Sequence, residues 1–496
     1  MTATVPAWLD ATAQAELVSS GAVAPEVLVE AAIERIERHD GEVGAVIHRR
    51  FDRALAEARA VDRDLPLAGV PTLVKETSAM AGEPYDLGSA VLAAAGIRAT
   101  ADDLIVRSMR KAGMVVLGQS MAPELALVST AENRAHGQAR NPWNLRHTSG
   151  GSSGGASAAV AAGFVPVGQG GDGGGSIRMP AAFTQLVGLK PSRGLVAPRP
   201  GGDRWGHSVP AYVTRTVRDT ALMMDLLTAD APGALARGLP PGAFTTALAR
   251  PPRRLRIGVL TNALTRGEPV DPEVDAAVEA VAARLEELGH TVVASYPERF
   301  SDPANVEAFF DALSVTATAS IDRLAEPLGH RLTDDELDPI TRLWDERGRS
   351  ITGLELAAAF VELEHLRAAM EQWWSSGFDV LLAPVFATPP LELGWPWREP
   401  DGIRKTVDVV RLTAPINSTG QPAIAVPGGF SSGGLPIGVQ LVGELGQDAL
   451  LVALAAELEQ ATPWDTDHPA WLDPTTGADP ALLSCADTGH GPAPAP

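Results

Sequence analysis

Apolar residues recur along the chain with two different spacings, which predicts alternating helices and strands. From residue 25 to residue 39 they recur every four positions, as at Leu28 and Ala32, and most of the charged residues fall outside that stripe. This is the pattern of an amphipathic helix. The short apolar run from Gly69 to Val74, which ends at Lys75, instead has the length and composition of a buried strand. Such alternation is typical of an α/β fold with a parallel or mixed sheet.

The same reasoning assigns further elements. We expect strands at residues 43–47, 69–74, 114–117, 164–167, 255–260, 290–295, 380–383, 423–426 and 437–442. We expect helices at residues 10–21, 25–39, 51–62, 272–288 and 449–460, and a long helical region at 305–377. Strands lie on both sides of a connection rich in Gly, Pro and Ala at residues 229–252. The sequence therefore favours one domain with a peripheral helical section over two independent domains.

Composition and charge narrow the class of protein. The 496 residues carry 40 Lys and Arg against 61 Asp and Glu, a net charge of −21 that disfavours binding to nucleic acid. We find neither a secretory signal nor an apolar run of the roughly 20 residues needed to cross a membrane. The single cysteine, Cys485, cannot form an internal disulfide. These features predict a cytoplasmic protein with no membrane partner.

The segment from residue 149 to residue 191 contains two clusters of glycine and serine. The first, GGSSGG, has the composition of a flexible linker, but it leads into an apolar helix and strand rather than a polar segment. The second, GGDGGGSIR, places Ser176 at the predicted start of a helix. Backbone N–H groups at such a position point into one concavity and would hold an oxyanion. The predicted donors are those of Gly173, Gly174, Gly175 and Ser176.

Two alternative readings of this segment lack their motifs. A phosphate-binding loop requires G-x-x-x-x-G-K-[ST], and the nucleophile elbow of other serine hydrolases requires G-x-S-x-G; neither spacing is present here. Ser176 is therefore a candidate nucleophile of a different kind, and a serine hydroxyl needs a base to activate it.

Lys75 is the candidate base. None of the ten histidines lies in a local pattern that marks a catalytic member. Lys75 closes the apolar strand GVPTLVK, and partial burial there lowers a lysine pKa from its usual value of about 10.4. A lysine that snorkels from a strand end is the alternative, and the strand alone does not decide between the two.

These motifs together resemble the amidase signature family. The resemblance rests on GVPTLVKE, on two serines 24 positions apart in GGSSGG and GGGSIR, on VGLKP, and on the downstream blocks APINSTGQPAIAVPGGF and GLPIGVQLVG. It extends from about residue 7 to residue 475. Within the family, WLDATAQAELV, RNPWNL, RIGVLT and WWSSGFDVLLAP resemble the 6-aminohexanoate cyclic-dimer hydrolase group of nylon-oligomer amidases.

The resemblance implies one α/β domain at residues 1–475, in which helices cover both faces of a central mixed sheet. Its core signature would span residues 69–200 and its peripheral, pocket-forming section about residues 300–400; residues 476–496 form a tail that we expect to be disordered. The resemblance also implies that neither a metal nor an organic cofactor is needed. It raises the hypothesis of a homodimer, for which the sequence shows no surface motif.

The resemblance further implies a Ser–cis-Ser–Lys triad. Ser176 matches the nucleophile, Ser152 the bridging serine that follows a cis peptide bond, and Lys75 the base. Asp172, Arg178 and Ser153 would support the triad, although an ordinary ion pair explains the first two equally well.

One departure from the family pattern concerns the nucleophile loop. The family often has threonines in this loop, whereas this chain has Gly171 and Gly173. The backbone donors survive that change, but the two side chains do not. Further along the chain, Asn417 and Gln421 are expected to satisfy buried backbone groups.

The sequence therefore predicts a serine amidase that cleaves a small non-peptide, oligomeric or cyclic amide through an acyl-enzyme. Three alternatives stay open: a general aliphatic or aryl acylamidase, the glutaminase subunit of an amidotransferase, and a catalytically inactive amide-binding scaffold. Six aromatic residues are candidates for the substrate pocket, although such residues more often belong to the core: Phe309, Phe310, Trp373, Trp374, Trp395 and Trp397.

Overall fold

A computed structural model describes residues 6–197, 206–229, 239–261, 269–300, 302–398, 406, 409–464 and 466–472. Its centre is a mixed sheet of eleven described strands in the order β1-β3-β2-β8-β10-β9-β14-β15-β13-β11-β12. The strands are β1 (Val46–Ile47), β2 (Pro71–Lys75), β3 (Val115–Ser120), β8 (Val167–Asp172), β9 (Val187–Lys190), β10 (Val209–Thr214), β11 (Arg256–Val259), β12 (Thr291–Ala294), β13 (Val380–Pro384), β14 (Ala423–Phe430) and β15 (Pro436–Gly443). Two short hairpins, β4 (Glu132–Asn133) with β5 (Gly137–Gln138) and β6 (Arg140–Asn141) with β7 (Asn144–Thr148), lie outside it.

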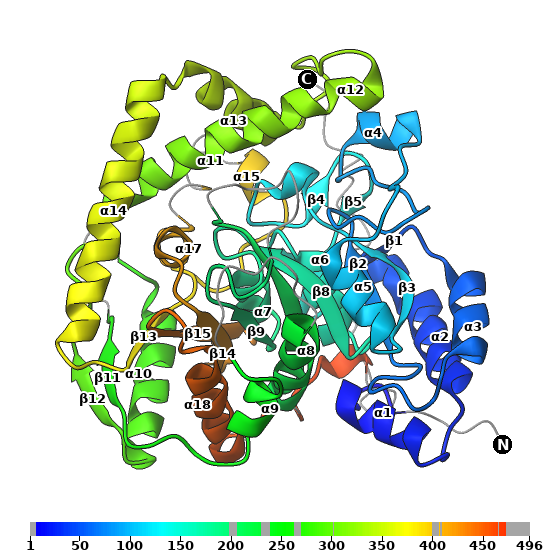
Figure 1. The fold of residues 1–496 in the computed structure, drawn as a ribbon, viewed down its shortest axis with the longest axis horizontal. Coiled ribbons are helices and arrows are strands. Elements are labelled where there is room, and N and C mark those ends of the chain that lie inside the picture. Colours follow the sequence, from blue (N-terminus) through cyan, green and yellow to red (C-terminus); the bar gives the residue numbers. More distant parts are fainter. Residues whose placement is uncertain are drawn as a thin grey trace.

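Helices cover both faces of this sheet (Figure 1). They are α1 (Ala11–Ser19), α2 (Pro25–Val43), α3 (Phe51–Ala60), α4 (Ala90–Ala95), α5 (Leu104–Lys111), α6 (Gly154–Ala161), α7 (Arg178–Phe183), α8 (Val217–Ala229), α9 (Ala243–Ala247), α10 (Pro272–Glu287), α11 (Pro303–Arg323), α12 (Ala325–Leu328), α13 (Pro339–Ser350), α14 (Gly353–Ser375), α15 (Trp395–Arg398), α17 (Ala414–Thr419) and α18 (Asp448–Ala461). No helix among the described residues is both long and apolar enough to cross a membrane.

The order of strands explains how distant segments meet. Strand β2 pairs in parallel with β3 on one side and with β8 on the other, so the carboxyl ends of all three reach the same edge. Strand β10 then runs antiparallel between β8 and β9. Strands β14 and β15 continue the sheet and bring the last part of the chain beside β9. Ligands of α/β proteins commonly bind at the carboxyl ends of parallel strands.

Many of the predicted helices and strands are present in the structure, and the first helix is an example. Asp10 accepts a hydrogen bond from the N–H of Ala13 and so caps α1, as its position before the helix predicted. Strand β2 ends at Lys75. The predicted helical region after residue 304 contains α11, α13 and α14, which form the section at the top and left of Figure 1.

Three details of the prediction are wrong, and a fourth is not tested. Helix α2 continues to Val43, so the predicted strand at 43–47 shrinks to Val46–Ile47. The strand predicted at 164–167 begins only at Val167 and continues through the glycine-rich residues of β8. Strands β9 and β10 were not predicted. The predicted tail at 476–496, with Cys485, lies outside the described residues.

Candidate active site

The candidate base lies at the end of strand β2, where the strand reaches the common edge of the sheet. Thr72 and Leu73 pair with the start of β8, so Lys75 and the glycines of β8 emerge side by side. The backbone N–H of Lys75 donates to Gln169 Oε1 on β8 at 2.9 Å, which fixes the last residue of β2 to its neighbour.

The GGSSGG segment is a packed turn rather than a linker. Every residue from 148 to 170 is buried. A Cβ at Gly151 would collide with the backbone of Thr130, and one at Gly155 with the backbone of Met121. These glycines therefore permit a close approach that leaves no room for side chains. The peptide bond between Gly151 and Ser152 is cis, as the resemblance implied.

Lys75 contacts both serines of this turn. Its Nζ donates to Ser152 Oγ at 2.7 Å and to Ser153 Oγ at 3.1 Å. Ser153 Oγ in turn accepts a hydrogen bond from the N–H of Gly171 at 3.2 Å. The lysine head group is therefore connected through Ser153 to the strand that carries the second glycine cluster.

The environment of Lys75 favours its neutral form. Only 3% of the residue is exposed, and burial lowers its pKa to about 7, even though the carboxylates of Glu76 and Asp172 act in the opposite direction. An amine with this pKa is partly unprotonated near neutral pH and can accept a proton from Ser152. The snorkelling alternative requires an exposed ammonium, and the structure excludes that.

Ser176 lies between strand β8 and helix α7. Its carbonyl accepts a hydrogen bond from the N–H of Ser153 at 3.2 Å, which ties the two serine segments together. Ser176 is half-buried, and it lines the same cavity as Lys75 and Ser152. The three residues that the sequence selected, separated by up to 101 positions, thus meet at one place.

The loop before Ser176 corrects one predicted donor. The N–H of Gly175 donates to Asp172 Oδ1 at 2.8 Å, so it is directed away from the cavity, and Gly175 does not line that cavity. In the described part of the chain, the N–H groups of Gly173, Gly174 and Ser176 have no such acceptor, and these residues line the cavity.

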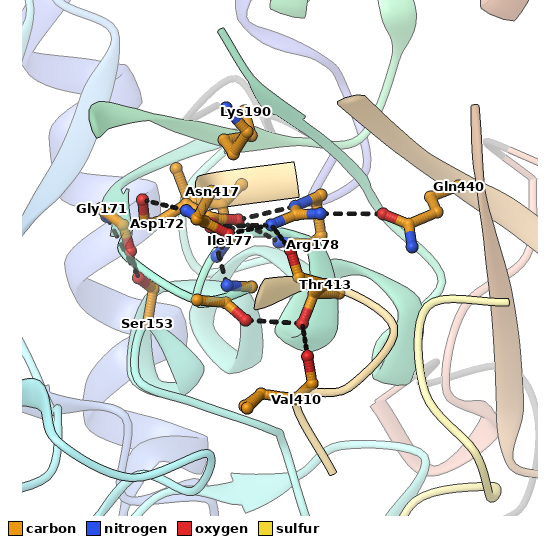
Figure 2. Close-up of polar contacts among 12 residues, drawn as sticks. Ser153, Gly171, Asp172, Ile177, Arg178, Lys190, Val410, Thr413, Asn417 and Gln440 are labelled. Atoms are coloured by element: carbon orange, nitrogen blue, oxygen red, sulfur yellow. Dashed lines mark hydrogen bonds and ion pairs between the residues drawn. The ribbon is translucent and has the colours of Figure 1, made fainter. Parts of the chain in front are cut away.

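A buried ion pair between Asp172 and Arg178 supports the loop that leads to Ser176 (Figure 2). Arg178 and Asp172 are both 0% exposed, and the guanidinium meets the carboxylate through Nε–Oδ2 at 3.0 Å and Nη2–Oδ1 at 3.1 Å. Burial alone would raise the pKa of Asp172, but Arg178, Lys190 and Asn417 bring it below its usual range. The carboxylate is therefore ionised, and it orients the backbone that leads to Ser176.

Residues from the last third of the chain complete this network. Asn417 Oδ1 accepts from Arg178 at 2.6 Å, and its Nδ2 donates to the backbone of Asp172 at 3.0 Å and of His207 at 2.9 Å. Gln440 Oε1 accepts from Arg178 on the opposite side at 2.8 Å (Figure 2). The sequence had assigned Asn417 to buried backbone groups, which is confirmed. Gln440 stands in the block GLPIGVQLVG that carries the resemblance, but the sequence had assigned it no role.

The cavity beside Ser176 has a volume of about 840 Å³. Proteins bind small molecules in cavities of roughly 300–1,000 Å³. Phe309, Phe310 and Trp344 line one side, from helices α11 and α13, and a polar region includes Arg98 and Asp102. Two of the six candidate aromatic residues therefore reach the cavity. The other four do not line it; Trp373, for example, stacks on Phe378 in the core.

Comparison with known proteins agrees with this geometry. The family model described as Amidase matches residues 27–452. The chain belongs to the amidase signature family. It is 36% identical to 6-aminohexanoate-cyclic-dimer hydrolase of Paenarthrobacter ureafaciens over 486 residues, which cover 95% of this chain and 98% of that protein.

Solved structures of the family superpose closely on this fold. A structure of 6-aminohexanoate cyclic dimer hydrolase complexed with substrate has a TM-score of 0.89 and 36% identity, covering 95% of this chain and 100% of that one. A bacterial aryl acylamidase of the amidase signature family has a TM-score of 0.82 and 31% identity, covering 92% and 97%. Membership of this family makes the chain an amidase, a hydrolase of carbon–nitrogen bonds other than peptide bonds.

Proposed function

We propose that this amidase cleaves its substrate through an acyl-enzyme on Ser176, with Ser152 as the proton shuttle and Lys75 as the base. The observation that carries the proposal is the 2.7 Å hydrogen bond between Lys75 Nζ and Ser152 Oγ, on the wall of the cavity that Ser176 also lines. A buried amine with a pKa of about 7, bonded to a serine hydroxyl, supports the role of a base.

The proposed reaction has two halves. Ser176 Oγ attacks the amide carbonyl while its proton passes to Ser152, and the proton of Ser152 passes to neutral Lys75. The protons then return through Ser152 to the leaving nitrogen, so that the C–N bond breaks and the amine departs. Water attacks the resulting ester on Ser176 with the same groups as base, which releases the carboxylic acid and restores the enzyme.

The developing oxyanion needs preorganised donors. The N–H groups of Gly173, Gly174 and Ser176 are the donors that we propose, since that of Gly175 already bonds to Asp172. Loss of one such donor typically lowers kcat by about 10²–10³. Asp172, Arg178 and Ser153 act in this proposal by positioning the loop and the lysine.

We propose oligomeric or cyclic aliphatic amides as the substrate class. The support is the 36% identity over nearly the whole length to an enzyme named for hydrolysis of a cyclic 6-aminohexanoate dimer. The cavity of about 840 Å³, with apolar aromatic residues on one side, has room for such a molecule. Aryl amides are the second candidate, because a bacterial aryl acylamidase shares the fold at 31% identity.

The test measures release of primary amine from four substrates: the cyclic 6-aminohexanoate dimer, linear 6-aminohexanoate oligomers, simple aliphatic amides and anilides. Ser176→Ala is the blank. If the wild type releases amine from the cyclic dimer or linear oligomers and Ser176→Ala releases none, both the triad and the substrate class are supported. Turnover of anilides or simple amides alone keeps the triad and refutes the substrate class.

Adjacent serines provide a matched control. Ser152 and Ser153 both accept a hydrogen bond from Lys75, but the proposal gives only Ser152 a role in proton transfer. We expect Ser152→Ala to lower kcat by a factor of about 10³ or more and Ser153→Ala by about tenfold or less. Equal losses in the two variants would refute the assignment of the shuttle.

A further inference from the structure

Three residues with metal-ligating side chains meet outside the active-site cavity. They are His48, which follows strand β1, Asp86, in the segment after β2, and His136, in the turn between β4 and β5. One ligand atom from each lies within 4.8 Å of the others. None of the three lines the cavity that holds Ser176.

The two distances from Asp86 in this cluster are close to those of a coordination shell. Asp86 Oδ2 lies 2.6 Å from His48 Nε2 and 3.0 Å from His136 Nε2. Zinc ligand bonds of about 2.0–2.1 Å in tetrahedral geometry place neighbouring ligand atoms roughly 3.3 Å apart. Small side-chain movements would therefore let all three atoms contact one ion.

One oxygen of a buried carboxylate faces the same point and has no hydrogen-bond donor in the described part of the chain. Glu76 is 0% exposed; its Oε1 accepts a hydrogen bond from the N–H of Ala122, whereas its Oε2 lies 3.8 Å from His136 Nε2 and has no hydrogen-bond donor among the described residues. The Glu76 carboxyl also comes within hydrogen-bonding reach of the Asp86 carboxyl. Two carboxyl groups in contact need a proton or a cation between them. A buried acceptor beside the His136 imidazole is an independent sign that a cation belongs there.

Access and ligand chemistry indicate the class of ion. The side chains of His48 and His136 are 22% and 16% exposed, so an ion can reach the cluster from solvent, whereas Asp86 is 2% exposed. Two imidazoles and one carboxylate suit divalent transition ions such as zinc better than magnesium or calcium, which prefer oxygen ligands.

We propose that His48, Asp86 and His136 form a binding site for a divalent transition metal of the zinc class. The site goes beyond the amidase activity and does not depend on it. The resemblance implied that the reaction needs no metal, and the proposed hydrolysis does not use one. The ion would join three segments of the chain that no helix or sheet pairing connects to one another directly.

The experiment uses the full-length chain without a histidine tag, stripped with EDTA and titrated with ZnCl₂ in a calorimeter. We expect one zinc per chain and a melting temperature that rises with zinc concentration. His48→Gln and His136→Gln should each weaken binding at least tenfold. Glu76→Gln, which replaces the adjacent acid by an amide of the same shape, should weaken it less than either histidine variant does.

The matched control is His330→Gln. His330 also lies against a carboxylate, that of Glu336 at 3.0 Å. This pair is on the surface, and among the described residues it belongs to no group of three ligating side chains. This variant should bind zinc as the wild type does. Circular dichroism establishes that each variant is folded.

The Cu²⁺ form of the wild type provides a second test that needs no substitution. Its electron paramagnetic resonance spectrum should show couplings to nitrogen atoms of two imidazoles.

The proposal is overturned if the wild type binds no zinc, if folded His48→Gln and His136→Gln bind it like the wild type, or if the copper spectrum lacks two nitrogen ligands. In each of those cases a proton shared between Glu76 and Asp86 accounts for the cluster.

Discussion

Replacement of Asp172 by asparagine tests the account of the nucleophile loop in depth. The carboxylate accepts hydrogen bonds from two nitrogens of Arg178, from Asn417 Nδ2 at 2.9 Å and from the N–H of Gly175 at 2.8 Å. Asparagine keeps one acceptor oxygen, removes the charge and turns an NH₂ group toward these donors. Arg178, which is 0% exposed, would then retain its charge without a counter-ion.

The magnitude follows from what remains around the arginine. Breaking a buried ion pair by removing one partner costs about 3–5 kcal/mol of unfolding free energy. Gln440, Asn417 and the carbonyl of Thr413 still accept hydrogen bonds from the guanidinium in the variant. These neutral acceptors reduce the penalty, so we expect a loss near the lower end of that range, about 3 kcal/mol.

The assay is urea unfolding followed by tryptophan fluorescence, with Asp322→Asn as the control. Asp322 pairs with Arg349 at 2.8 Å, but both side chains are exposed, at 48% and 31%, so this variant should lose about 1 kcal/mol or less. We also expect Asp172→Asn to lower kcat by about 10² or more, because the N–H of Gly175 then competes with Arg178 and Asn417 for one uncharged oxygen. A stability loss for Asp172→Asn no larger than that of the control would refute the reasoning.

Three further predictions follow from the same geometry. Lys75 must be neutral to accept a proton, and burial lowers its pKa to about 7. We therefore expect kcat/KM to fall about tenfold per pH unit below pH 7 and to level off above it. A profile that is flat from pH 5.5 to 8 would contradict this. Lys75→Arg supplies a group that stays protonated, so amine release should drop by about 10³ or more; near wild-type turnover would exclude Lys75 as the base. Gly173→Ala places its Cβ at an ordinary distance of 3.5 Å from Ser208 and should keep the unfolding free energy within about 1 kcal/mol of wild type. Gly175→Ala should lose more, because φ is +125° there and the Cβ would lie 2.8 Å from Thr413 Cβ; equal stability of the two variants would contradict the structure of the loop.

The sequence predicted best where one physical cause acts locally. Helix α10 (Pro272–Glu287) follows a cap at Asp271 and an apolar stripe, and its predicted span at 272–288 is correct within one residue. Lys75 was found because a charged residue closed an apolar strand, and the serines because glycine clusters flanked them. The resemblance to the amidase signature family then assigned a role to each.

The sequence failed where the deciding contacts join distant segments. Strand β10 pairs with β8 between residues that are 37 to 47 positions apart, and no apolar run marks β10 strongly. Gln440 and Thr413 reach Arg178 from more than 230 positions away. The donation of Gly175 to Asp172 depends on the turn of the loop, which a run of glycines leaves undetermined. His48, Asp86 and His136 lack the close spacing that a metal motif requires.

The most direct test of the central claim is covalent labelling with a fluorophosphonate, read by intact mass and peptide mapping. The account predicts one adduct per chain, located on Ser176, at an unchanged extent in Ser153→Ala and absent from Ser176→Ala. Labelling should also slow strongly in Ser152→Ala, because the proton of Ser176 then has no route to Lys75. An adduct on another residue, or full labelling of folded Ser176→Ala, would contradict the claim that Ser176 is the nucleophile.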